Sequence, residues 1–97
     1  MGAYHMRAAR IDKNQPAIVD ALRKMGASVQ ILSTVGDGFP DLAVGINGRN
    51  YLVEVKYEDG KLTPDQVKWH SEWKGQKVVI RGIGEAINFL RSCNERG

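Results

Sequence analysis

Alternating apolar and polar residues predict a β-hairpin in the middle of the chain. The runs "DLAVGI", which begins at Asp41, and "RNYLVEVK", which ends at Lys56, flank the dipeptide Asn47-Gly48. This dipeptide is the strongest short-range signal for a type I′ turn, in which both central residues take positive φ. The pattern therefore predicts a tight antiparallel hairpin.

Helical periodicity predicts helices on both sides of this hairpin. In the first, over 12–25, Ile18, Leu22 and Met25 recur at helical spacing. A second covers 63–73 and a third 84–91. The second begins with a capping box, a pattern in which the cap residue and the third helical residue bind each other's main chain. Its members are Thr63, Pro64 and Gln66.

Two shorter β-rich runs, 28–32 and 77–81, complete the order α-β-β-β-α-β-α. A chain of 97 residues has room for one core, so residues 1–97 are expected to form a single α/β domain. The opening residues 1–10, with the polar stretch "MGAYHM", are treated as a lead or cloning remnant outside the fold.

The turn fixes which residues face each other across the hairpin. Counting outward from it pairs Ile46 with Arg49 and brings Asp41 opposite Glu54, with Lys56 on the same face. Directly opposed like charges are destabilising unless a positive group lies between them. Mg²⁺ and Mn²⁺ prefer such hard oxygen ligands, so a divalent cation is the natural candidate.

A simpler interpretation is also open. Asp41 then only ends a loop, while Glu54 and Lys56 form a surface ion pair worth about 1 kcal/mol or less. The rest of this face favours the metal site, because its small and apolar residues are expected beneath a covering helix, with the acids at the edge of a cleft. These residues are Ala43, Gly45 and Leu52.

Two glutamines are candidate site residues with a structural alternative each. Gln15 lies on the packing stripe of the first helix, near its start, and either reaches the cleft or caps the helix. Gln66 either serves the capping box alone or also the site. The aromatic residues that follow it are expected in the core rather than stacked on DNA, and His70 is not favoured as a catalytic base. They are Trp69, His70 and Trp73.

Composition indicates which class of partner and which cellular compartment to expect. The charge of 14 − 11 = +3 favours a polyanionic partner. Cys93 is the only cysteine and cannot form a disulfide within the chain, and with two histidines it does not make a usual zinc site. We expect a reducing, cytoplasmic location and no membrane span. Basic residues that either contact phosphates or are solvated surface are Arg10, Lys13, Arg49, Lys61, Lys68 and Lys74.

With these positions fixed, the chain resembles a known family. Pro40-Asp41 and "EVK", which ends at Lys56, resemble the PD-(D/E)xK nuclease signature. Together with "GFPDLAVG", "YLVEVK" and "KLTPDQVKWHSEW", they are similar to the virus-type replication-repair nuclease domain, especially its small stand-alone phage-type members. This similarity extends from Asp12 to Leu90 and implies a restriction-endonuclease-like fold, with a central mixed sheet flanked by helices.

The resemblance also implies a metal site. Asp41 and Glu54 would bind one or two Mg²⁺ or Mn²⁺ ions, the main-chain carbonyl of Val55 would add a ligand, and Lys56 would position the attacking water. Gln66 matches a glutamine of the family.

One position departs from the family pattern. Members commonly carry a metal-binding glutamate on the first helix, where this chain has Asn14-Gln15. Gln15 is therefore the candidate for a third ligand, directly or through water.

The function implied is a structure-selective DNA endonuclease. Stand-alone members resemble archaeal Holliday junction resolvases, which implies branched DNA as substrate, a role in DNA repair and a homodimer, since a four-way junction needs two symmetric nicks. Two alternatives remain: a non-catalytic DNA-binding module on the nuclease fold, motivated by the missing helix-one glutamate, and a nuclease subunit that needs a targeting partner.

Overall fold

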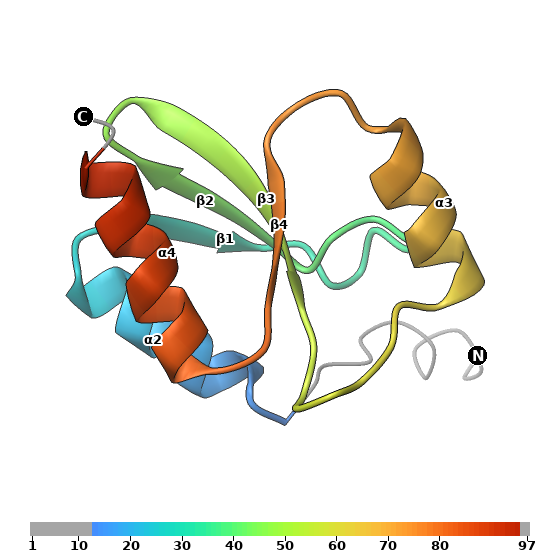
Figure 1. Cartoon of the computed structure of the whole chain (residues 1–97), viewed down its shortest axis with the longest axis horizontal. Coiled ribbons are helices and arrows are strands. Elements are labelled where there is room, and N and C mark those ends of the chain that lie inside the picture. Colours follow the sequence, from blue (N-terminus) through green and yellow to red (C-terminus); the bar gives the residue numbers. More distant parts are fainter. Residues whose placement is uncertain (1–12, 96–97) are drawn as a thin grey trace.

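The computed structural model describes residues 13–95, so the lead, Arg10 and Asp12 lie outside the described residues. Within that range the predicted order of elements is confirmed (Figure 1). The elements are α2 (Gln15–Lys24), β1 (Ser28–Ile31), β2 (Leu42–Ile46), β3 (Arg49–Val55), α3 (Pro64–Glu72), β4 (Lys77–Ile80) and α4 (Ile83–Glu95). Helix α2 begins later than predicted because Pro16 is accommodated only in a first helical turn.

The strands form one mixed sheet in the order β1-β2-β3-β4. The pairs β1–β2 and β2–β3 are antiparallel, and β3–β4 is parallel. A parallel pair cannot be joined by a tight turn, so the chain crosses from β3 to β4 through the segment that contains α3. The mixed sheet flanked by helices is therefore confirmed.

The hairpin between β2 and β3 has the predicted turn and register. Asn47 and Gly48 take φ values of 54° and 77°, as a type I′ turn requires. Ile46 pairs with Arg49. The Asn47 side chain donates a hydrogen bond to Asn94 Oδ1 at 2.9 Å, which ties the turn to the end of α4.

The core lies on one face of the sheet, beneath α2 and α4, which pack side by side (Figure 1). Both helices bury apolar residues against strand residues at alternate positions, as the hairpin periodicity predicts. The helices contribute Ile18, Val19, Leu22, Ala86, Leu90 and Cys93, and the strands contribute Leu42, Val44, Tyr51, Val53, Val55 and Ile80. None of the helices within residues 13–95 is long and apolar enough to cross a membrane.

The opposite face of the sheet differs from the prediction. Ala43, Gly45 and Leu52 were expected beneath a helix, but they are only half-buried, because α2 and α4 both cover the other face. Helix α3 stands apart from that pair (Figure 1), and none of its residues is buried. The prediction of a covering helix is wrong because α3 has too few apolar residues to bury a full stripe against the strands.

Candidate metal centre

Asp41 lies immediately before β2, at the end of the hairpin. The strand ladder closes with the pair Leu42–Val53, one position short of it. Its main-chain carbonyl accepts a hydrogen bond from Leu32 N–H at 2.7 Å, and its carboxylate Oδ2 accepts one from Val55 N–H at 2.8 Å. The Asp41 side chain thus extends the ladder onto β3. This contact holds the carboxylate against the strand that carries Glu54.

Glu54 is the other carboxylate and is 1% exposed. Its Oε2 accepts a hydrogen bond from Gln66 Nε2 at 3.0 Å and lies 3.9 Å from Lys56 Nζ. A buried carboxylate is costly without such partners. The Lys56 side chain is itself only 13% exposed, so the interpretation as a surface ion pair is wrong.

Gln66 combines the two roles that the sequence left as alternatives. Its Oε1 accepts the Thr63 N–H at 2.9 Å, while Thr63 Oγ1 accepts the Gln66 N–H at 3.2 Å, so the predicted capping box is confirmed. With Oε1 held by the cap, the Nε2 end of the amide is directed at Glu54. The cap therefore orients the side chain that contacts the carboxylate.

Gln15 is 2% exposed, and its Nε2 donates to Ser33 Oγ at 3.3 Å. Its Oε1 accepts no hydrogen bond from the described residues. The interpretation as a cap is wrong, because Asn14 occupies the cap position. Asn14 Nδ2 donates to the carbonyl of Lys56 at 3.0 Å. The start of α2 is thus tied to the end of β3.

The donors at this end of the sheet fit a hard divalent cation. Asp41 and Glu54 provide carboxylates, and the Asp41 carboxylate accepts a hydrogen bond from Val55 on the strand that carries Glu54. The amide oxygen of Gln15 is a buried oxygen at the start of α2, which the Asn14–Lys56 hydrogen bond ties to the end of β3. Within residues 13–95 no group of three or more His, Cys, Asp or Glu side chains is suited to hold a metal ion. A metal site here would therefore need amide or main-chain oxygens, water or substrate as further ligands, as is common for Mg²⁺.

The aromatic residues of α3 and of its C-terminal cap, Trp73, form a separate cluster, and the prediction that they belong to the core is wrong. The Trp69 and Trp73 rings stack with their centres 4.9 Å apart. The Phe39 ring meets both edge-on, with its centre 5.3 Å from that of Trp69 and 6.1 Å from that of Trp73. Trp73 is 40% exposed. Partial burial and the nearby charge of Lys77 lower the pKa of His70, which packs beside Trp69.

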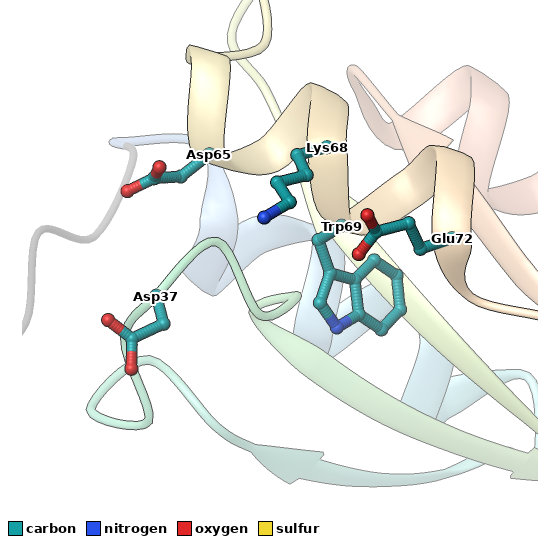
Figure 2. A pocket seen from close by; sticks show the side chains of 5 residues that line it. All are labelled: Asp37, Asp65, Lys68, Trp69 and Glu72. Carbon is teal, nitrogen blue, oxygen red and sulfur yellow. The ribbon is translucent and has the colours of Figure 1, made fainter.

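A hollow of about 270 Å³ lies between α3 and the β1–β2 loop (Figure 2). It is lined by Asp37, Asp65, Lys68, Trp69 and Glu72 and includes neither carboxylate of the candidate metal centre. Its acidic lining disfavours phosphate, so Lys68 is a poor candidate for a DNA contact. Lys13 forms a cation–π contact within the chain, since its Nζ lies 4.6 Å from the centre of the Tyr57 ring.

The comparisons with known proteins agree with this architecture. Neither a family model nor a curated protein matches the sequence. A solved structure described as "VRR_NUC domain" is 26% identical, and the match covers 87% of this chain and 97% of that chain with a TM-score of 0.69. The chain therefore has the fold of a virus-type replication-repair nuclease domain, the family that its motifs resemble.

Proposed function

We propose that the protein is a metal-dependent endodeoxyribonuclease that hydrolyses phosphodiester bonds. The observation that carries this proposal is the buried Glu54 carboxylate, held by Lys56 and Gln66 at the strand end where Asp41 also binds β3. A charge buried at 1% exposure in a domain of this size has a high desolvation cost. The nuclease-domain fold supports a catalytic explanation for that cost.

Each residue has a distinct role in this proposal. Asp41 and Glu54 would hold Mg²⁺ or Mn²⁺, with the carbonyl of Val55 and the amide oxygen of Gln15 as further donors. When bound, the cation supplies Lewis-acid polarisation of the scissile phosphate. Lys56 Nζ, beside Glu54, positions the attacking water by hydrogen bonding and offsets the negative charge that develops on the phosphate oxygens.

Branched DNA cut by a homodimer is the proposed substrate and assembly. Residues 13–95 provide one candidate centre, whereas symmetric cleavage of a four-way junction needs two centres related by a two-fold axis. The net charge of +3 supports affinity for a polyanion.

Cleavage of labelled four-way junctions, flaps and linear duplex in Mg²⁺ or Mn²⁺ tests this function. The wild type is expected to cut the branched substrates best. Asp41→Ala is expected to lose both cleavage and Mn²⁺ binding, while Lys56→Ala is expected to lose cleavage and keep Mn²⁺ binding. Undiminished cutting by Asp41→Ala would refute the site assignment.

A non-catalytic DNA-binding module is the second candidate. It is favoured by Gln15, a neutral residue where the family commonly has a metal-binding glutamate. Calorimetry with Mn²⁺ separates the two functions. Mn²⁺ binding that disappears in Glu54→Ala supports the nuclease, and DNA binding without any Mn²⁺ binding supports the module.

A further inference from the structure

Helix α3 contacts the candidate metal centre although it is weakly anchored to the rest of the fold. None of its residues is buried, and it stands apart from α2 and α4 (Figure 1). Nevertheless, its Gln66 reaches the Glu54 carboxylate. Whether this side chain stays within 3.0 Å of Glu54 depends on what holds the first turn of α3 in place.

The loop between β1 and β2 packs against the first turn of α3 through Gly38. Gly38 has a φ of +80°, and a Cβ added to it would lie 2.5 Å from the carbonyl oxygen of Asp65 and 3.1 Å from the nitrogen of Gln66. Main chain thus packs on main chain, closer than any side chain permits. Figure 2 shows the loop that carries Asp37 facing the turn of α3 that carries Asp65.

The next residue of the same loop extends the support along α3. The Phe39 ring contacts Trp69 at 5.3 Å and Trp73 at 6.1 Å, toward the other end of the helix. The loop then leads through the buried Pro40 to Asp41. One short segment therefore carries Asp41 and also supports the helix that contacts Glu54.

We propose that Gly38 is a positioning residue of the candidate metal centre, which lets the loop lie against the first turn of α3 and so keeps Gln66 on Glu54. The proposal rests on the proposed function for its catalytic meaning. The contact itself is a property of the protein without metal. Because Glu54 is held through a neighbouring amide, losing that amide is expected to weaken metal binding by about tenfold or more.

The test compares Gly38→Ala with Gly36→Ala, a matched control in the same loop. Gly36 has a φ of +83°, and a Cβ there meets no atom within 4 Å. Both variants therefore place alanine at a positive φ and carry the same kind of backbone strain, but only the Gly38→Ala methyl group clashes with the Asp65-Gln66 peptide. The first measurement is the NMR signal of the Gln66 side-chain amide in the metal-free protein, and the second is Mn²⁺ affinity by calorimetry.

In Gly38→Ala the Gln66 amide protons are expected to move to the position and exchange rate of a solvent-exposed amide, and Mn²⁺ affinity is expected to fall about tenfold. In Gly36→Ala both are expected to stay close to wild type. Gly38→Ala combined with Gln66→Met is expected to bind Mn²⁺ no more weakly than Gln66→Met alone, because the first change acts through the second residue.

Equal changes in the two glycine variants would assign the effect to backbone strain and overturn the proposal. Additive losses in the double variant would overturn it as well. Failure of the proposed function looks different: the wild type would then neither bind Mn²⁺ nor cut DNA. In that case the Gln66 amide signal still decides whether Gly38 positions the side chain.

Discussion

At the scale of single residues, Asp41 shows how one carboxylate holds two roles. Its Oδ2 accepts the Val55 N–H at 2.8 Å, so it completes the hairpin where the strand ladder ends. The same carboxylate is a proposed metal ligand. The two roles differ in what they need, because the hydrogen bond needs an acceptor oxygen and the metal needs charge.

Replacing Asp41 by asparagine or alanine is expected to separate these roles. Asparagine keeps an acceptor for Val55 N–H, so Asp41→Asn is expected to unfold in urea near wild type, whereas Asp41→Ala loses about 1 kcal/mol. Both variants are expected to lose Mn²⁺ binding in calorimetry. An asparagine variant that binds Mn²⁺ like wild type would remove Asp41 from the ligand set.

His70 is expected to make stability depend on pH. Partial burial and the charge of Lys77 place its pKa below the ordinary value of 6.5, so the unfolded chain takes up the proton at a higher pH than the folded one. The part of the unfolding free energy that depends on His70 is therefore fully present above pH 6.5 and is lost as the pH drops below it. Between neutral and mildly acidic pH, the urea midpoint of the wild type is expected to fall more than that of His70→Gln. Parallel decreases would contradict this.

At the scale of elements, the capping box is expected to control α3 more than the rest of the fold. Thr63→Ala removes the Thr63 Oγ1 acceptor of the Gln66 N–H, a loss of about 1 kcal/mol for a typical helix cap. Thr63→Ser keeps a hydroxyl and is the control. Amide hydrogen exchange in α3 is expected to accelerate in the alanine variant and not in the serine variant. Faster exchange in both would show that the methyl group, not the cap, matters.

Local signals predicted the elements well. Asn47-Gly48 determines the turn, and with it the register from Leu42 to Val53, while Thr63 and Gln66 determine the start of α3. Both signals act over two to four residues, so they can be recognised without knowing the tertiary structure. The carboxylates of Asp41 and Glu54 followed from that register and from the motif.

The placement of helices could not be predicted in the same way. The alternation separates a strongly apolar face, which forms the core, from a face of mostly small and polar residues, but it does not tell whether a helix also covers this second face. The support of α3 by Gly38 is a close approach of two main chains, with no apolar pattern in the sequence. A glycine between Asp37 and Phe39 is compatible with a loop and gives no signal for its contact with α3.

At the scale of the whole molecule, stability is expected to be uneven. The core joins α2 and α4 to the sheet, whereas α3 buries no residue and packs against Gly38 and Phe39 of the β1–β2 loop. Hydrogen exchange is expected to show that the amides of α3 open well before those of β2 and β3, because local opening follows the buried apolar contacts. Equal protection of α3 and the central strands would show that the domain opens as one unit.

The stacked tryptophans at α3 also determine which part of the protein its intrinsic fluorescence monitors. Trp69 and Trp73 are its only tryptophans, and both lie against Phe39 rather than in the core. Intrinsic fluorescence is therefore an optical probe of α3. A melting curve recorded at the tryptophan emission is expected to report the loss of contact between α3 and its loop, and to be insensitive to unfolding of the sheet beneath α2 and α4.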